Sequence, residues 1–264
     1  MQNILRIVTL PGRQQDAMHL ICNADIIMAL EDLAIPPLQY ADVCSLQGWE
    51  TVGTRLCNPE TSSAGFSMNP APHIALGEYF FARQQGVQRF VLCHELRHAY
   101  QALQDLVWQQ YMRKRVRIVQ SKANGLVQEM WKFLSAPLEV DAQGYAFSKF
   151  VEDGSEIVLY RSNEVASKLA NYPNPLAHTL RSTVALLPEV YEWRKLLEKG
   201  LVLAKSRDAV ASNAQTVLDF LVKRTRAGND ARVNSFCIQY LETEPAQFLD
   251  VATDFFDYLV TLKD

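Results

Sequence analysis

Three residues in the segment RFVLCHELRHAYQALQDL (89–106) have the types and spacing of a metal-binding catalytic motif. His94 and His98 are four residues apart, and Glu95 follows the first histidine directly. On a helix, residues i and i+4 project from the same face, so the two imidazoles could bind one ion. At about 100° per residue, Glu95 flanks that face and could reach a water molecule. The motif therefore predicts a zinc centre in which Glu95 is the general base.

The helix that must carry this motif is expected to cover residues 87–112. Its apolar residues fall opposite the histidines, and they are Leu92, Leu96, Ala99, Leu103 and Val107. Gln101 and Asp105 share the histidine face and are candidates for the outer shell of a metal site. A solvated amphipathic helix with two surface histidines explains the apolar stripe equally well, but it does not explain the glutamate after the first histidine.

A catalytic zinc ion needs a third protein ligand and one open position. The remaining histidines lie outside the short spacing that would complete the motif, and they are His19, His73 and His178. The best candidate is Glu139, in SAPLEVDAQGYAFSKF (135–150), which predicts a second helix over 136–150. Glu139 falls on the apolar face of this helix, whereas Asp141 faces solvent, and an inward carboxylate is costly unless it is paired or binds a metal. Asp141, Glu129 on the preceding helix, and a first-turn glutamate stabilised by the helix dipole stay open as alternatives.

These residues resemble the gluzincin metallopeptidases, in which H-E-x-x-H supplies two zinc ligands and the base, and a glutamate on a later helix supplies the third ligand. The matching positions are HELRH (94–98) and Glu139 in PLEVDA, a pairing that is similar to small bacterial and phage-type zincins. The resemblance covers residues 65 to 150. It implies one Zn²⁺ ion and hydrolysis of a peptide or protein substrate. Two positions depart from the family pattern: Arg97 is charged, and Gln143 stands where several gluzincins have an aspartate.

Other features of the family have weaker candidates in this sequence. The residues that could stabilise an oxyanion are Tyr145, Tyr172, His178 and Arg97. In zincins an edge strand before the active-site helix pairs with the substrate, and PHIALGE (72–78), with Pro70 and Pro72, is in the matching place. The alternative to an enzyme is a catalytically weak or inactive zincin scaffold that acts through regulatory or protein-binding interactions.

The local patterns predict an α+β fold that is predominantly helical and zincin-like. ILRIVTL (4–10) indicates a strand, 15–34 a helix, and short β-type runs between 48 and 80 (WETVGTRLC, AGFSMN and HIALGEYFF) a small sheet. Further helices are expected over 124–134, 156–170, 177–199, 207–227, 230–242 and 245–261. We expect a metallopeptidase domain over 1–150 and a helical C-terminal region over 151–264.

Charge and cysteine content restrict the partners and the setting. The net charge of −3 argues against nucleic acid as a partner. The five cysteines are scattered and form no C-x-x-C pair, which favours a reducing compartment over a disulfide framework. No signal peptide or membrane-spanning run is recognised, so we expect a cytoplasmic protein without a membrane partner; the oligomeric state stays open.

Overall fold

The computed structural model describes residues 4–57, 64–120, 138–139, 141–149, 154–170, 190 and 193–227, together with single positions between 235 and 258. The chain divides into two compact units. The first comprises Met1–Gln109 and Tyr145–Phe150, and the second comprises Gln110–Gly144 and Val151–Asp264. The described elements are mostly helices with one small sheet, which confirms the predicted α+β class. The predicted division near residue 150 stays a prediction.

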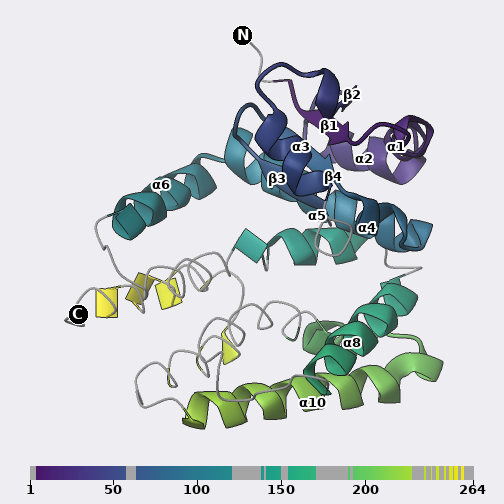
Figure 1. Cartoon of the computed structure of the whole chain (residues 1–264). Coiled ribbons are helices and arrows are strands. Elements are labelled where there is room, and N and C mark those ends of the chain that lie inside the picture. The colour runs from purple at the N-terminus through teal and green to yellow at the C-terminus, as the bar shows by residue number, and fades with distance from the viewer. Residues whose placement is uncertain are drawn as a thin grey trace. The chain divides into compact units, whose positions relative to one another are not determined.

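The first unit contains a mixed four-stranded sheet in the order β2-β1-β4-β3 (Figure 1). The strands are β1 (Arg6–Thr9), β2 (Gln39–Asp42), β3 (Ala64–Ser67) and β4 (His73–Leu76). Strand β1 pairs in parallel with β2 and β4, whereas β3 pairs antiparallel with β4. Ile7, Val8 and Ile74 are completely buried, so the sheet centre forms part of the core. Strands β1, β3 and β4 were expected, but β2 was not.

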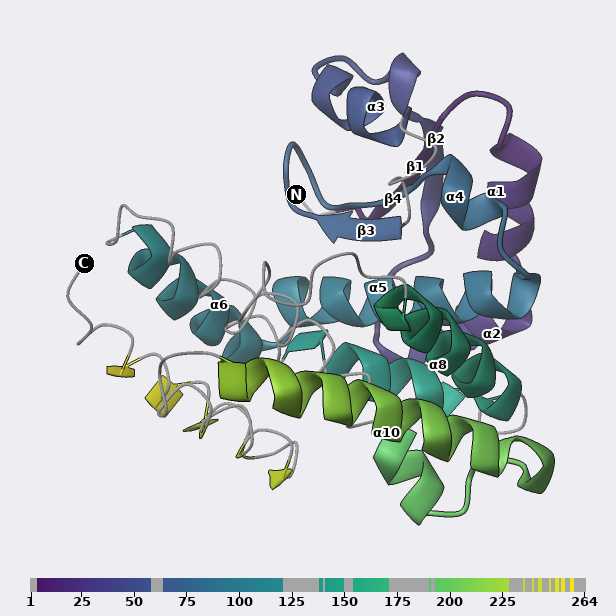
Figure 2. The same cartoon turned by 60° about the horizontal axis from the view of Figure 1, so that its bottom comes forward.

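The edge of the sheet differs from the sequence prediction. Strand β4, within the expected edge segment 72–78, is an inner strand because β1 and β3 pair with its two sides. Pro70 and Pro72 lie in the β3–β4 connection, where they leave the strand ladder intact. The edge strands are β2 and β3, and β3 runs beside α5 (Gln85–Leu103) as Figure 2 shows.

Two predicted helices are interrupted by capping residues. The segment 15–34 forms α1 (Gln14–Ile21) and α2 (Ala24–Asp32), and Asn23 Oδ1 accepts a hydrogen bond from the Asp25 amide at 3.0 Å. The segment 87–112 forms α5 and the start of α6 (Leu106–Gln120). Asp105 Oδ1 accepts bonds from the amides of Val107 and Trp108, at 3.0 and 3.3 Å. Each side chain satisfies donors that a new helix start exposes, so each begins a second helix.

The segment WETVGTRLC was wrongly expected to be a strand. It forms α3 (Glu50–Leu56), after the short 3-10 helix η1 (Val43–Ser45). Trp49, Val52 and Leu56 are buried in one cluster with Val8 of β1. Their spacing of three and four residues is the helical period, which outweighs the strand preference of single residues. The short α4 (Glu78–Phe81) then leads from β4 towards α5.

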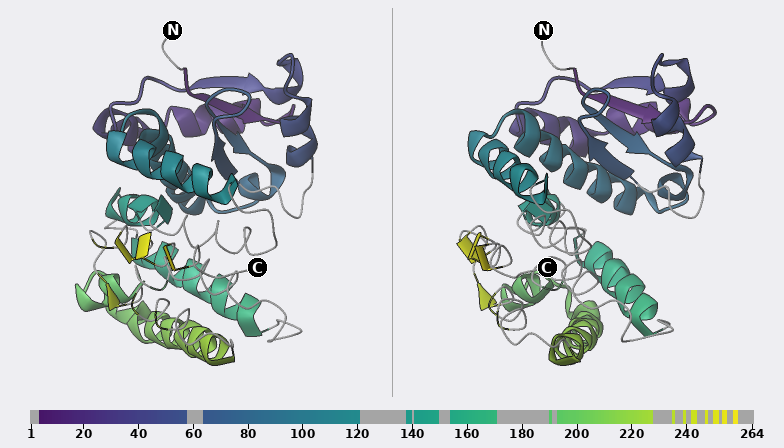
Figure 3. Two further views of the ribbon diagram at one scale, coloured as in Figure 1. Left: turned by 90° about the vertical axis from the view of Figure 1, so that its left-hand side faces the viewer. Right: turned by 60° about the vertical axis from the view of Figure 1, so that its left-hand side comes forward.

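The second unit contains two long helices that lie side by side, α8 (Gly154–Ala170) and α10 (Ala204–Ala227), in Figure 3. Asn213 Nδ2 donates to Ser162 Oγ at 3.0 Å and to Asn163 Oδ1 at 2.6 Å. The helices predicted over 156–170 and 207–227 are confirmed, and the one over 177–199 is seen at 193–198. The predicted helix 124–134 lies outside the described residues, as do most positions of 230–242 and 245–261. Within the described parts of the chain, no helix has the length and apolar character needed to cross a membrane.

His73 is a fully buried histidine in the small core beneath α3. Its Nδ1 donates to the Ala71 carbonyl at 2.7 Å, and its ring meets that of Trp49 at 4.8 Å. Its Nε2 is buried and has no hydrogen-bond partner among the described residues. Burial disfavours the imidazolium, which lowers the pKa of His73 below its ordinary value of 6.5.

We therefore expect acid to destabilise the first unit through His73. Because the folded pKa is lower than the unfolded one, the unfolded chain binds the proton first, and stability falls as the pH drops below about 6.5. His73→Asn keeps a donor for Ala71 but does not titrate, so its melting temperature should change less between pH 7.5 and pH 5.5 than that of the parent. The exposed His19 supplies the control, since His19→Asn should retain the parental pH dependence. Equal pH dependence in the parent and His73→Asn would contradict this assignment.

Candidate metal centre

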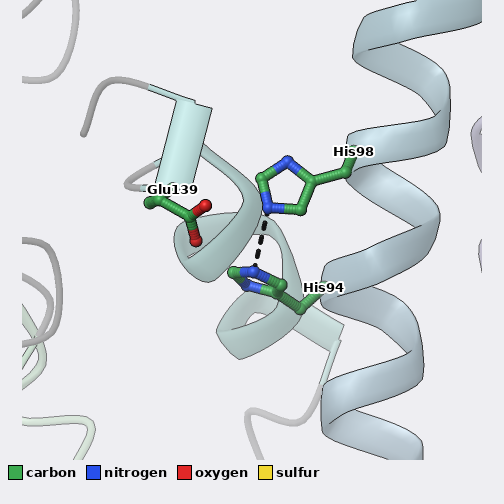
Figure 4. A group of neighbouring side chains, drawn as sticks. All are labelled: His94, His98 and Glu139. Carbon is green, nitrogen blue, oxygen red and sulfur yellow. Dashed lines mark hydrogen bonds between the residues drawn. The ribbon is translucent and has the colours of Figure 1, made fainter. Parts of the chain in front are cut away.

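The two motif histidines project from one face of α5 and meet at their Nε2 atoms (Figure 4). The Nε2 atoms of His94 and His98 are 3.0 Å apart, and the rings are nearly perpendicular at 87°. Two nitrogens bound to one tetrahedral zinc ion at about 2.05 Å lie about 3.3 Å apart. The spacing of the two imidazoles is therefore close to what one ion requires.

Gln101 determines the tautomer of His98. The His98 Nδ1 atom lies 2.8 Å from Gln101 Oε1, and Gln101 is only 1% exposed. An amide oxygen only accepts, so His98 must carry its proton on Nδ1. In the neutral ring Nε2 is then the acceptor atom, and it faces the Nε2 of His94. A metal-ligating histidine commonly donates its other N–H to an oxygen in this way, so this contact fits the outer-shell role expected for Gln101.

Glu139 brings a carboxylate to the two imidazoles. It belongs to a helix of residues 138–139 and 141–149, here called the Glu139 helix. One potential ligand atom from each of His94, His98 and Glu139 lies within 4.8 Å of the other two. Figure 4 shows the carboxylate directed towards the rings. Asp141, the alternative ligand considered from the sequence, is not in this group, and Glu129 lies outside the described residues.

The last turns of the Glu139 helix are fixed to α2 and α5 within the first unit. The Phe147 ring packs against Phe90 of α5 with centroids 4.7 Å apart. Lys149 Nζ lies 2.9 Å from Asp32 Oδ2 at the end of α2, and this hydrogen bond is the main reason that the pKa of Asp32 is lowered. Tyr145 donates to the Ala29 carbonyl at 3.3 Å.

Arg97, the charged residue within HELRH, contacts the same helix. Its guanidinium lies over the ring of Tyr145, 5.4 Å from the centroid, and over Tyr100 of α5 at 4.7 Å. A guanidinium over an aromatic face gains about 0.5–2 kcal/mol, depending on exposure. Arg97 therefore has a packing function between α5 and the Glu139 helix. The Tyr145 hydroxyl faces α2. Burial is the main cause that raises the pKa of Tyr145, and a hydrogen bond with Asp32 is the second. The oxyanion roles expected for Arg97 and Tyr145 have no support in this geometry.

Glu95 lies on the side of α5 that faces the sheet. It is 9% exposed, and its Oε2 accepts a hydrogen bond from the Phe66 amide of β3 at 2.7 Å. Among the described residues, no other donor contacts this carboxylate. Sequence reasoning placed Glu95 beside the histidine face but missed Phe66, because a backbone donor from another strand leaves no signal in residue type.

The other residues considered from the sequence have different placements. Asp105 caps α6 and is not on α5, so the helical position expected for it was wrong. Cys93 is completely buried, and burial raises the pKa of its thiol to about 12, in agreement with packing rather than metal binding. His178 and Tyr172, the remaining oxyanion candidates, lie outside the described residues.

Comparison with known proteins gives no family for this chain. No family model matches it, and neither a curated protein nor a solved structure matches it significantly. The resemblance to gluzincins therefore rests on the motif and the three-residue group, and stays a prediction.

The first test of the centre compares two acidic residues of one helix. Glu139→Ala should weaken Zn²⁺ binding by more than about 100-fold because it removes a proposed ligand, while Asp141→Ala should change it less than about threefold. Competition against a chromophoric chelator measures both affinities. A larger loss from Asp141→Ala would overturn the assignment of Glu139.

A second test concerns Gln101. Gln101→Met has a similar volume but cannot accept a hydrogen bond from the His98 Nδ1–H. We therefore expect Zn²⁺ affinity to fall about 10- to 100-fold. Gln101→Glu retains an acceptor oxygen and should lose less affinity than Gln101→Met. Thermal unfolding of the metal-free variants provides the control for folding. Equal Zn²⁺ affinity in Gln101→Met and the parent would show that His98 does not depend on this hydrogen bond.

Proposed function

We propose that this protein is a zinc-dependent peptidase in which His94, His98 and Glu139 hold the metal and Glu95 is the general base. The observation that carries the proposal is the gathering of ligand atoms from all three residues within 4.8 Å, beside a buried glutamate. Each of these roles was expected from the H-E-x-x-H spacing and the inward-facing glutamate.

The donor set favours zinc among the common metal ions. Two imidazole nitrogens and one carboxylate oxygen are a usual set for catalytic Zn²⁺, whereas Mg²⁺ and Ca²⁺ prefer oxygen ligands. A bound Zn²⁺ ion would supply Lewis acidity and lower the pKa of a water molecule to about 7. The Gln101 contact supports the same conclusion, because a proton on Nδ1 makes Nε2 the ring nitrogen of His98 that could bind a metal.

Glu95 would move the protons of the reaction. Its Oε2 is held by the Phe66 amide, and its other oxygen has no hydrogen bond among the described residues. That oxygen could take a proton from the attacking water and deliver it to the leaving amine. The substrate would lie as an extended peptide along β3, the outer strand beside α5.

Glu95→Gln is the direct test of this function. The variant should bind one Zn²⁺ per chain, as we also expect of the parent, because Glu95 is not among the proposed ligands. Cleavage of a mixed peptide library, followed by mass spectrometry, should fall at least about 100-fold because the general base is lost. Glu50→Gln, at an exposed glutamate of α3, is the matched control and should retain parental cleavage.

Each contrary outcome has its own meaning. A parent that binds no stoichiometric Zn²⁺ after metal is supplied would exclude the proposed centre. A parent that binds Zn²⁺ but cleaves no peptide would favour the non-catalytic scaffold. Equal cleavage by Glu95→Gln and the parent would exclude Glu95 as the base.

A further inference from the structure

Glu95 accepts its hydrogen bond from a β3 amide that takes no part in the hydrogen bonds between β3 and β4. Phe66 lies opposite Ile74 in the antiparallel β3–β4 register. In such a pair of strands, residues that exchange both hydrogen bonds alternate with residues that exchange none. Since the Phe66 N–H points to Glu95, Phe66 is at a non-hydrogen-bonded position. Gly65 and Ser67 then bond to β4, while Ala64 faces outward like Phe66.

The contact satisfies a carboxyl group that is nearly buried. The Glu95 side chain is 9% exposed, such a polar group is costly unless a donor satisfies it, and the 2.7 Å separation from the Phe66 nitrogen is within the range of an N–H···O hydrogen bond. Glutamate has three side-chain torsions, so without this bond the carboxylate could occupy several positions. The bond therefore selects one position and leaves the second oxygen in a defined place.

We propose that the Phe66 backbone amide positions Glu95 for proton transfer, so that the outer strand β3 fixes the base of the reaction. This inference rests on the proposed peptidase function. It makes Phe66 a positioning residue that acts through its amide and not through its ring. If β3 both pairs with an extended substrate and bonds to Glu95, the same few backbone residues set the positions of the substrate and of the base. The distance between the two would then vary little.

Hydrogen exchange tests the contact without any need for activity. An outward amide at a sheet edge should exchange rapidly, so in the metal-free parent the Phe66 amide should exchange about tenfold or more slowly than that of Ala64. Glu95→Ala should remove this protection at Phe66 and leave Gly65 and Ser67 protected. Equal exchange at Phe66 in the parent and Glu95→Ala would overturn the proposal.

Two substitutions at one position then separate the amide from the ring. Phe66→Ala lacks the ring but keeps the N–H, whereas Phe66→Pro lacks both. Because this N–H is not part of the β3–β4 ladder, proline removes its bond to Glu95 and no strand hydrogen bond. We expect kcat of Phe66→Pro to be about 10- to 100-fold below that of Phe66→Ala, with similar KM, since a displaced base slows proton transfer.

Ala64→Pro controls for proline in the strand. It removes the neighbouring outward N–H without contact to Glu95, so metal-free Ala64→Pro and Phe66→Pro should have similar melting temperatures and bind Zn²⁺ equally. Equal kcat in Phe66→Pro and Phe66→Ala would overturn the positioning role while leaving the peptidase intact. Absence of activity in the parent would instead overturn the peptidase function and the role that rests on it, whereas the exchange result would still report the contact.

Discussion

Helix α5 is buried on several sides, and this burial restricts the polar side chains that it carries. Leu92, Leu96 and Ala99 are completely buried, while Glu95 and Gln101 are buried polar residues on the same helix. Each unpaired group would cost about 1–3 kcal/mol, and more for a charge. Glu95 is satisfied by the Phe66 amide and Gln101 by the His98 ring. The bonds that make α5 compatible with the core are therefore the ones that orient the proposed base and one proposed ligand.

The arrangement of the candidate site was more predictable from the sequence than the fold around it. His94, Glu95 and His98 are adjacent on one helix, so their relation follows from helical geometry alone. Glu139 was found because an acidic residue on an apolar face needs a reason to be there, and the structure brings it to both histidines. The oxyanion candidates were less predictable, because the direction of a side chain such as Tyr145 depends on α2, a neighbour that is distant in sequence.

The differences between the predicted and the observed fold have two physical sources. Asn23 and Asp105 each begin a new helix inside a continuous amphipathic pattern, and the periodicity of apolar residues does not register such a cap. Strand order depends on pairing between distant segments. The polar β2, Gln39–Asp42, has little local strand signal and forms because β1 offers it a partner, and β4 became an inner strand because β3 covers its other side.

X-ray absorption at the zinc edge tests most directly whether two imidazoles and one carboxylate hold one zinc ion. In protein loaded with one equivalent of Zn²⁺, we expect a first shell of nitrogen and oxygen at about 2.0–2.2 Å with scattering from two imidazole rings. Glu139→Ala should change this shell, and Asp141→Ala should not. A sulfur ligand near 2.3 Å, or scattering from fewer than two imidazoles, would contradict the assignment of His94, His98 and Glu139.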